Sequence, residues 1–212
     1  MGLVEDHRRR MVDEQLRPHG ITDARVLAAL GTVPREEFVP ADLKPYAYVD
    51  RALGIDAGQT ISQPLVVAAM TQALGLERDA TVLEVGTGSG YQAAVLSLLA
   101  GRVVTIEREP VLAEQAAATL RRLGYANVEV VLGDGSAGHP EAAPYPAILV
   151  AAAATVVPAA LLAQLADGGR MVIPVEPPAG AEHQERRRYR RRGGEIANEV
   201  LFPVRFVPLI TG

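Results

Sequence analysis

The middle of the chain alternates between short apolar runs and amphipathic segments. Runs rich in Val, Ile and Leu predict buried strands, whereas apolar residues three or four positions apart predict helices. Strands are expected at 80–85, 102–107, 128–132, 147–152 and 170–175, and helices at 91–100, 110–123 and 158–165. This order is typical of βαβ units, so the sequence predicts an α/β, Rossmann-like fold with a mostly parallel, doubly wound sheet.

Helical segments come before this region, and a predicted hairpin follows it. Prolines and glycines mark the helix ends, because proline suits the first helical position and glycine the left-handed conformation just beyond the last. We expect one domain over 1–212, with an N-terminal helical cover (1–57), a ligand-binding core (58–175) and a C-terminal hairpin (176–212). The elements expected in the flanks are a charged helix at 3–16, a helix from an N-cap at Thr22 to Leu30 with Gly31 beyond it, a proline-bracketed turn at 33–40, a helix from Pro64 closing at Gly75, and a hairpin of 186–192 and 199–208.

Composition narrows the class of protein. The 212 residues are 49% hydrophobic with a mean hydropathy of +0.12, which is enough to bury a full core. A net charge of -4 and a pI near 5.6 give no general reason to expect nucleic acid or an anionic membrane as a partner. Cysteine is absent, which excludes disulfides and thiolate chemistry. Residues 1–10 are charged without an apolar region behind them, and no apolar run is long enough to span a bilayer, so we expect a cytoplasmic protein.

The strand expected at 80–85 leads directly into a glycine-rich turn. It carries Glu84 and is followed by Gly86-Thr87-Gly88-Ser89-Gly90. Glycine lets the backbone approach a ligand closely, and the start of the following helix offers unpaired N–H groups. The G-x-G-x-G spacing differs from the G-x-G-x-x-G that seats a dinucleotide pyrophosphate, which favours a ligand without a diphosphate. The alternative is a tight strand-to-helix turn with a purely structural role.

Further acidic residues end the next two strands. Glu107 closes the strand at 102–107, where a doubly wound fold holds a ribose diol, and Asp134 lies between two glycines after the strand at 128–132. The glycine turn contains no lysine or arginine that could bind a phosphate. Together with these acids, this favours a neutral or cationic nucleoside over a phosphorylated one. The alternative for Asp134 is simple termination of its strand, although the flanking glycines favour a ligand role.

Several segments taken in order carry a family resemblance. They are similar to the bacterial protein-L-isoaspartate O-methyltransferases, and the similarity covers nearly the whole chain. The glycine turn alone marks only the broad class of S-adenosylmethionine-dependent methyltransferases, whereas the Gln-Thr-Ile-Ser-Gln-Pro block is far narrower. The segments are Val33-Pro34-Arg35, Gly58-Gln59-Thr60-Ile61-Ser62-Gln63-Pro64, the glycine turn, Thr105-Ile106-Glu107-Arg108, Gly133-Asp134-Gly135, Ala142-Ala143-Pro144-Tyr145 and residues 204–209.

The resemblance implies a reaction, a cofactor and a set of site residues. The reaction would transfer a methyl group from S-adenosyl-L-methionine to the free carboxylate of L-isoaspartyl residues in damaged proteins. The ester would then close to a succinimide and return partly to aspartate. The implied residues are Gly86, Thr87, Gly88, Ser89 and Gly90 in the cofactor turn, Glu84 and Glu107 on the amino-acid and ribose parts, Asp134 and Gly135 beside the adenine, and Thr60, Ile61 and Ser62 on the substrate, with Ser62 as the catalytic residue that orients the carboxylate.

Ser62 and the histidines also have plainer explanations. A serine just before a proline-initiated helix is ordinarily an N-cap, and only its place in the motif favours catalysis for Ser62. A carboxylate needs no base, because the unperturbed pKa of aspartate is roughly 3.9. His139 is therefore expected to be a surface or packing residue, and the histidines lack metal-ligand spacing. His139, Pro146 and Ala151 stand where the family usually carries Trp, Asp and Thr, which affects the expected peptide preference more than cofactor binding.

Six arginines surround a tyrosine at 186–192. Such a run binds RNA or an acidic protein segment in some proteins, but a hairpin strand with solvated arginines is the simpler interpretation, so no stable nucleic-acid partner is expected. Three alternatives to isoaspartyl repair stay open. They are a methyltransferase of the same fold acting on another carboxylate or small molecule, a non-catalytic S-adenosylmethionine- or RNA-binding protein, and a nicotinamide dehydrogenase, which the glycine spacing disfavours.

Overall fold

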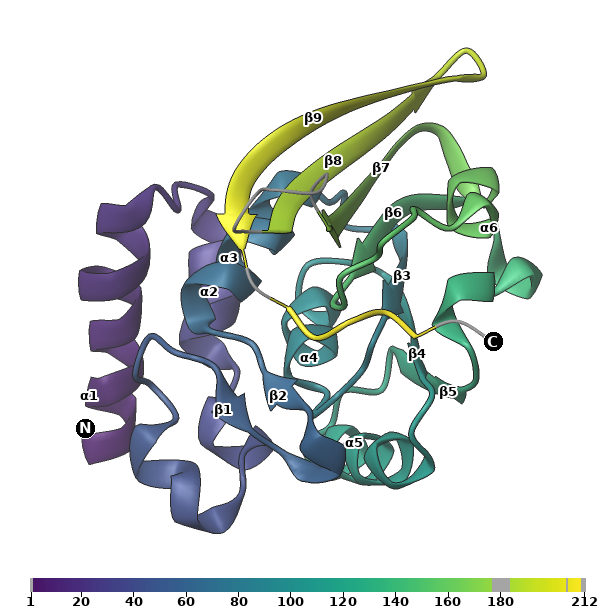
Figure 1. Ribbon diagram of the computed structural model, residues 1–212. Helices are drawn as coiled ribbons and strands as arrows, with labels where there is room; N and C mark the ends of the chain where they lie inside the picture. Colours follow the sequence, from purple (N-terminus) through teal and green to yellow (C-terminus); the bar gives the residue numbers. More distant parts are fainter. Residues whose placement is uncertain (1, 177–183, 205, 211–212) are drawn as a thin grey trace.

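A seven-stranded sheet forms the centre of the molecule (Figure 1). The computed structural model describes residues 2–176, 184–204 and 206–210. The strand order is β5-β4-β3-β6-β7-β8-β9; the strands from β3 to β7 are parallel, and β8 is antiparallel to both of its neighbours. The predicted parallel sheet with a C-terminal hairpin is thereby confirmed. The strands are β3 (Thr81–Val85), β4 (Arg102–Glu107), β5 (Val128–Leu132), β6 (Tyr145–Val150), β7 (Leu165–Val175), β8 (Gln184–Arg192) and β9 (Glu195–Val204).

Helices and short turns surround the sheet. The first helix continues through a π-helical turn (Met11–Leu16) and a 3-10 turn (Arg17–His19), and a small antiparallel pair of strands, β1 and β2, precedes α3. Other 3-10 turns are Arg35–Phe38, Ala41–Tyr46, Asp56–Gly58, Gly135–Ala137 and Pro140–Ala142. The helices are α1 (Leu3–Arg10), α2 (Ala24–Thr32), α3 (Pro64–Leu74), α4 (Tyr91–Ser97), α5 (Pro110–Arg122) and α6 (Ala159–Ala163), and the two short strands are β1 (Leu53–Gly54) and β2 (Thr60–Ile61).

Side chains alternate along the central strands, so the sheet has a hydrophobic cluster on each face. Val82 belongs to the larger cluster, which contains buried residues of the N-terminal elements, α2, α3 and α4. Its neighbour Leu83 belongs to the smaller cluster, which includes Tyr145, Leu161 and Tyr189. The N-terminal helices therefore pack into the same core as the sheet. Across the described ranges, no helix is long and apolar enough to cross a membrane.

The second helix differs from its prediction at both ends. Its N-cap is Asp23 and not Thr22, because the Asp23 carboxylate accepts hydrogen bonds from the N–H groups of Arg25 and Val26. The helix also continues through Gly31 to Thr32. Pro34 explains this end, since a proline forces the residue before it into an extended conformation, and Val33 has φ -65° and ψ 123°.

The last strands also begin earlier than predicted. A strand was expected at 170–175 after a helix at 158–165, but β7 starts at Leu165, which pairs with Tyr145, and α6 ends at Ala163. The second strand of the hairpin starts at Glu195 and not at 199, because the turn is made by the two glycines at 193 and 194. The strand pairing, which the local pattern does not contain, sets these boundaries.

Candidate active site

The glycine turn joins β3 to α4 and is anchored to the neighbouring strand. Gly86 and Gly88 have φ of 91° and 52°, which are unfavourable for residues with a Cβ. The N–H groups of Gly86 and Thr87 donate to the carbonyl oxygen of Ile106 at 2.9 and 3.2 Å. The turn is thus fixed at the carboxyl ends of β3 and β4, the edge at which parallel α/β sheets bind ligands.

The carboxylate of Glu107, at the end of β4, organises the two loops beside it. Oε2 accepts a hydrogen bond from the N–H of Gly88 at 2.8 Å. Oε1 accepts from the N–H groups of Arg108 and Glu109 at 2.9 and 3.0 Å. A carboxylate oxygen has room for about two hydrogen bonds, so Oε2 can accept one more from a ligand, while Oε1 is saturated.

Glu84 lies within β3, and its side chain is fully buried. Within the described part of the chain, neither carboxyl oxygen has a hydrogen-bond partner. Burial raises the pKa of Glu84 to about 8; the Thr105 hydroxyl acts in the opposite direction, and the charge of Glu107 adds to the increase. The hydroxyls of Thr87 and Thr105 lie 2.6 Å apart. Burial therefore favours the protonated form of the Glu84 carboxyl, two residues before the glycine turn.

The Thr60–Ile61 strand and Ser62 lead into α3 on another side of the turn. Ser62 is not the helix cap: the N-cap is Gln63, which makes no side-chain capping bond. Asp50 serves the helix start instead, because its Oδ1 accepts from the N–H of Leu65 at 3.1 Å and its Oδ2 accepts from the Gln63 amide at 2.7 Å. The plainer explanation of Ser62 as an N-cap is therefore wrong.

The segment after β9 returns to the centre of the sheet (Figure 1). The N–H of Ala153 donates to the carbonyl oxygen of Val207 at 2.8 Å, and the N–H of Leu209 donates to the carbonyl oxygen of Ala153 at 2.7 Å. These bonds hold the segment next to the loop that follows β6. No motif in the sequence indicates that a chain end returns to a distant strand, so this segment is absent from the predicted site residues.

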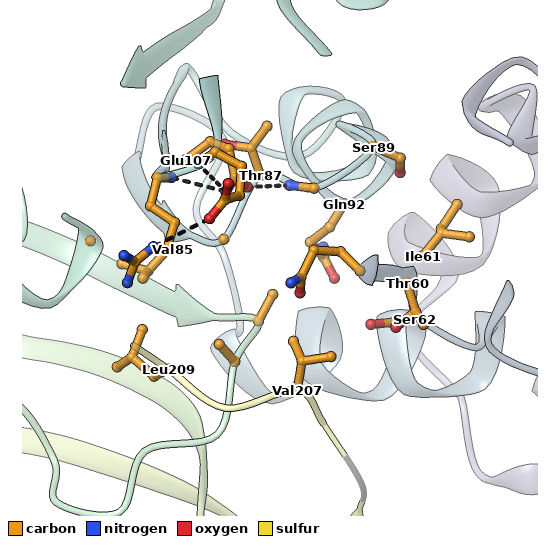
Figure 2. A pocket seen from close by; sticks show the side chains of 18 of the residues that line it. Thr60, Ile61, Ser62, Val85, Thr87, Ser89, Gln92, Glu107, Val207 and Leu209 are labelled. Atoms are coloured by element: carbon orange, nitrogen blue, oxygen red, sulfur yellow. Dashed lines mark hydrogen bonds and ion pairs between the residues drawn. The ribbon is translucent and has the colours of Figure 1, made fainter. Parts of the chain in front are cut away.

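One pocket is lined by the glycine turn, Glu107, the Thr60–Ser62 loop and the segment 207–210, but not by Glu84. Figure 2 shows Glu107 and Ser62 on different sides of it, with Val207 and Leu209 along a third side. Of the predicted site residues, Thr60, Ile61, Ser62, Gly86, Thr87, Gly88, Ser89, Glu107 and Gly135 line it, whereas Glu84, Gly90 and Asp134 do not. The other lining residues are Gln59, Val67, Val85, Tyr91, Gln92, Ile106, Arg108, Glu109, Ala151, Ala152 and 207–210.

Gly90 and Asp134 support the pocket from outside its surface. Gly90 has φ 87°, and a Cβ there would lie 3.3 Å from Leu120 of α5. The side chain of Asp134 accepts a hydrogen bond from the N–H of Ser136 at 2.8 Å and so shapes the turn that contains Gly135. A Cβ on Gly135 would lie 2.4 Å from Val85, so only glycine allows this loop to approach β3 so closely.

The three positions that depart from the family pattern lie in different surroundings. Ala151 lines the pocket, 3.6 Å from where a Cβ on Gly86 would be. Pro146 is exposed on β6. His139 lies outside the pocket lining, its N–H donates to the Gln164 amide at 2.9 Å, and its ring is 3.5 Å from Glu141. Among the described residues, no cluster of histidine and acidic side chains suits a metal ion.

Arginines of the run at 186–192 contact the protein itself. Arg188 donates to the carbonyl oxygen of Ala73 in α3 at 3.1 Å, and Arg191 donates to that of Leu162 in α6 at 2.5 Å. Arg186 is buried. Arg188 and Arg191 thus join the hairpin to helices on both faces of the sheet.

Comparison with known proteins identifies the family. The family model for protein-L-isoaspartate(D-aspartate) O-methyltransferase matches residues 7–212. The chain belongs to this family. Protein-L-isoaspartate O-methyltransferases of Herpetosiphon aurantiacus and Methylorubrum populi are 52% and 54% identical to it, over 97% and 99% of this chain and 91% and 98% of theirs. The family resemblance carried by the sequence motifs is confirmed.

Solved structures of this protein-L-isoaspartate O-methyltransferase family have the same fold. One is 31% identical with a TM-score of 0.86 and covers 97% of this chain; this chain spans 66% of its length. A structure from Plasmodium falciparum, described as a candidate member in complex with S-adenosyl-L-homocysteine, is 24% identical with a TM-score of 0.82 over 96% of this chain and 98% of its own. At that identity the second likeness shows the fold alone, and it confirms the predicted architecture.

Proposed function

We propose that this protein transfers a methyl group from S-adenosylmethionine to the free carboxylate of an L-isoaspartyl residue in a damaged protein. The observation that carries the proposal is that the glycine turn with Glu107 and the Thr60–Ser62 loop line the same pocket. Family membership supports the same reaction. A methyl transfer needs these two parts close together, because donor and acceptor atoms must be held in line and kept apart from water.

The residues present suit S-adenosylmethionine. The free acceptor capacity of Glu107 Oε2 fits one ribose hydroxyl, and Gly135 leaves space where a Cβ would collide with Val85 of β3. The carboxyl oxygens of Glu84 are buried without a hydrogen-bond partner among the described residues, and burial raises the pKa of this group to about 8. The assignment of Glu84 to the amino-acid part of the cofactor stays a prediction, since its side chain does not line the pocket.

S-adenosylmethionine, when bound, supplies an activated methyl group on a positively charged sulfur. The isoaspartyl carboxylate is the nucleophile and is ionised at neutral pH, because its unperturbed pKa is roughly 3.9. The Ser62 hydroxyl donates a hydrogen bond that orients this carboxylate. Ile61, Val207 and Leu209 are apolar side chains in the same pocket and exclude water from the reacting atoms. One C–O bond forms as one C–S bond breaks, so no proton has to move.

The methyl ester is the end of the enzyme's part in repair. The neighbouring backbone nitrogen attacks the ester, methanol leaves, and the resulting succinimide opens with water to aspartate or isoaspartate. The partner of this protein is therefore a peptide or protein segment with an isoaspartyl residue. A cytoplasmic location is a further part of the proposal, and cell fractionation tests it.

A non-catalytic RNA-binding role is the competing proposal that the arginine run raises. Arg188 and Arg191 donate to main-chain carbonyl oxygens of α3 and α6, so these N–H groups are not free to bind phosphates. We infer that the run mainly joins the hairpin to the helices. RNA affinity that falls steeply with salt, together with an absence of methyl transfer, would favour the RNA-binding role instead.

The decisive experiment measures methyl transfer to a synthetic isoaspartyl peptide beside its aspartyl twin. The two peptides differ only in which carboxylate is free, so they share charge and composition. We expect methyl ester on the isoaspartyl peptide and background incorporation on the twin. Equal methylation of both peptides would indicate a methyltransferase for other carboxylates. Binding of NAD in place of S-adenosylhomocysteine would indicate a dehydrogenase.

A further inference from the structure

Arg35 lies behind the wall of the pocket and touches it at two places. Its side chain has 0% exposure. Nε donates to the carbonyl oxygen of Ala47 at 2.7 Å, and Nη2 donates to the carbonyl oxygen of Ser62 at 2.7 Å. The guanidinium carbon lies 4.7 Å from the ring centroid of Tyr91. Ser62 and Tyr91 line the pocket, whereas Arg35 does not.

A buried guanidinium in this place is costly, so its interactions must be specific. Burial lowers the pKa of Arg35, which shows that its surroundings disfavour the charge. Both hydrogen bonds go to main-chain carbonyl oxygens, and the planar guanidinium can serve two such acceptors in a fixed geometry, which an ammonium cannot. An apolar side chain of similar size would fill the space without the cost of burying a charge. The arginine therefore contributes fixed positions of the two carbonyl groups that it binds, which an apolar side chain of the same volume would not provide.

The contacts of Arg35 lie on both parts of the proposed site. Ser62 belongs to the loop that enters α3, and Tyr91 is the first residue of α4 after the glycine turn. Asp50 holds the same loop a few residues later, through the N–H of Leu65 and the amide of Gln63. The loop is therefore attached to the N-terminal cover on both sides of Gln63, and Arg35 is the attachment that also reaches α4.

We propose that Arg35 is a positioning residue for methyl transfer: it fixes the main chain of Ser62 relative to Tyr91 and so holds the serine hydroxyl in place beside the cofactor turn. The inference rests on the proposed function. It requires that the loop loses its fixed geometry when the guanidinium is removed, while the surface that contacts the cofactor stays intact.

Arg25 provides a matched control in the same N-terminal cover. Its Nη1 and Nη2 donate to the carbonyl oxygens of Leu76 and Leu99 at 2.8 and 2.7 Å. Neither leucine lines the pocket. Arg35→Met and Arg25→Met therefore each remove a guanidinium that bonds two main-chain carbonyls, and both are expected to lower stability. Only the first removes a contact with the site.

The experiment compares backbone hydrogen exchange and steady-state kinetics of the two variants. In Arg35→Met, amides between Gln59 and Leu65 should exchange at least about tenfold faster, and kcat on isoaspartyl peptide should fall about tenfold to a hundredfold, the scale of small errors in positioning. The Kd of S-adenosylhomocysteine should change by less than about threefold, because Arg35 does not line the pocket and its loss should affect the reaction step more than cofactor binding. Arg25→Met should leave exchange in this loop and kcat near the wild-type values.

Arg35→Lys covers the case in which the methionine variant does not fold. Lysine keeps the charge but cannot serve both carbonyls in the arginine geometry, so an intermediate loss of kcat with faster exchange of the loop is expected. Equal effects of the Arg35 and Arg25 variants, or a full kcat with a weakened Kd for S-adenosylhomocysteine, would overturn the proposal. Absence of methyl transfer in the wild type would refute the proposed function, and loop exchange would still decide whether Arg35 holds Ser62.

Discussion

The carboxylate of Glu107 accepts a hydrogen bond from the backbone N–H of Gly88 at 2.8 Å, which joins the end of β4 to the middle of the glycine turn. The group expected to bind the ribose is therefore also a group that shapes the loop around it. Its second oxygen holds the start of the loop after β4 through two further N–H groups. If Glu107 binds the ribose, ligand binding and loop geometry are coupled through this one side chain.

Glu107→Ala should weaken S-adenosylhomocysteine binding by about 1 to 3 kcal/mol, the scale of losing a hydrogen bond to a charged group or leaving donors unsatisfied. It should also lower the melting temperature, because three backbone N–H groups lose their acceptor. Calorimetry and thermal melting measure the two effects. Glu109→Ala is the control, since Glu109 lines the same pocket but is half-exposed and pairs with Arg108 at 3.5 Å. Wild-type affinity in folded Glu107→Ala would remove Glu107 from the site.

The raised pKa of Glu84 predicts that the stability of the protein depends on pH. Its folded pKa is raised to about 8 from an ordinary value of 4.5. Between these two values the folded state holds a proton that the unfolded state has lost. The contribution of this group to stability is thus fully present below pH 4.5 and is lost as pH rises through about 8. The slope from one such group is at most about 1.36 kcal/mol per pH unit.

Glu84→Gln should remove this dependence, because glutamine keeps the shape of the protonated acid without titrating. We expect the variant to match the wild type near about pH 5 and to exceed its stability near about pH 8.5. Denaturant unfolding at both pH values measures the difference, with Glu109→Gln as a half-exposed control. The same pH slope in wild type and Glu84→Gln would show that Glu84 does not bind this proton.

Local patterns predicted the parts of the site that depend on local backbone geometry. The glycine turn and the start of α3 at Pro64 are set by residues close in sequence, and the structure has them where they were expected. Asp50, Arg35 and Leu209 act across long sequence separations, through hydrogen bonds that involve main-chain groups. Nothing in residue type or spacing predicts such partners. Family resemblance indicated that the terminal segment matters but not where it lies.

Glu84 is fully buried and does not line the pocket, so its contact with the amino-acid part of the cofactor stays a prediction. An acid before a glycine turn is typical of a ligand contact, and the pattern of residues does not reveal which face of a strand a ligand can reach. In the structure β3 is buried from Val82 to Val85, and the Glu84 side chain is not exposed. The sequence could predict the turn above Glu84, but not the depth of its side chain.

Arg188→Ala should lower the free energy of unfolding by about 1 kcal/mol, the typical net contribution of one hydrogen bond. Arg188 joins the hairpin to α3 through the carbonyl oxygen of Ala73 and also pairs with Glu199. Arg192 is exposed at the hairpin end, so Arg192→Ala is the control and should change stability by less than about 0.5 kcal/mol. Urea unfolding measures both. If Arg188→Ala and Arg192→Ala are equally stable, the run is a solvated surface and its arginines are available for other ligands.

Ser62→Ala tests the step that distinguishes a repair enzyme from a simple cofactor binder. If the hydroxyl orients the attacking carboxylate, its loss removes a hydrogen bond to a charged group, worth about 1.5 to 3 kcal/mol. Turnover on isoaspartyl peptide should then fall by roughly one to two decades, at about 1.36 kcal/mol per decade. The Kd of S-adenosylhomocysteine should change little, because the carboxylate and not the cofactor receives this bond.

The stability of Ser62→Ala should stay close to that of the wild type, since Asp50 and not Ser62 binds the start of α3. Asp50→Ala provides the comparison: loss of a helix-capping side chain typically costs about 1 kcal/mol, so its melting temperature should fall. Melting and initial rates are measured on the same preparations, and the Asp50 variant shows that the melting assay detects a lost cap. A lowered melting temperature with unchanged turnover in Ser62→Ala would assign the serine to the fold and remove it from the reaction.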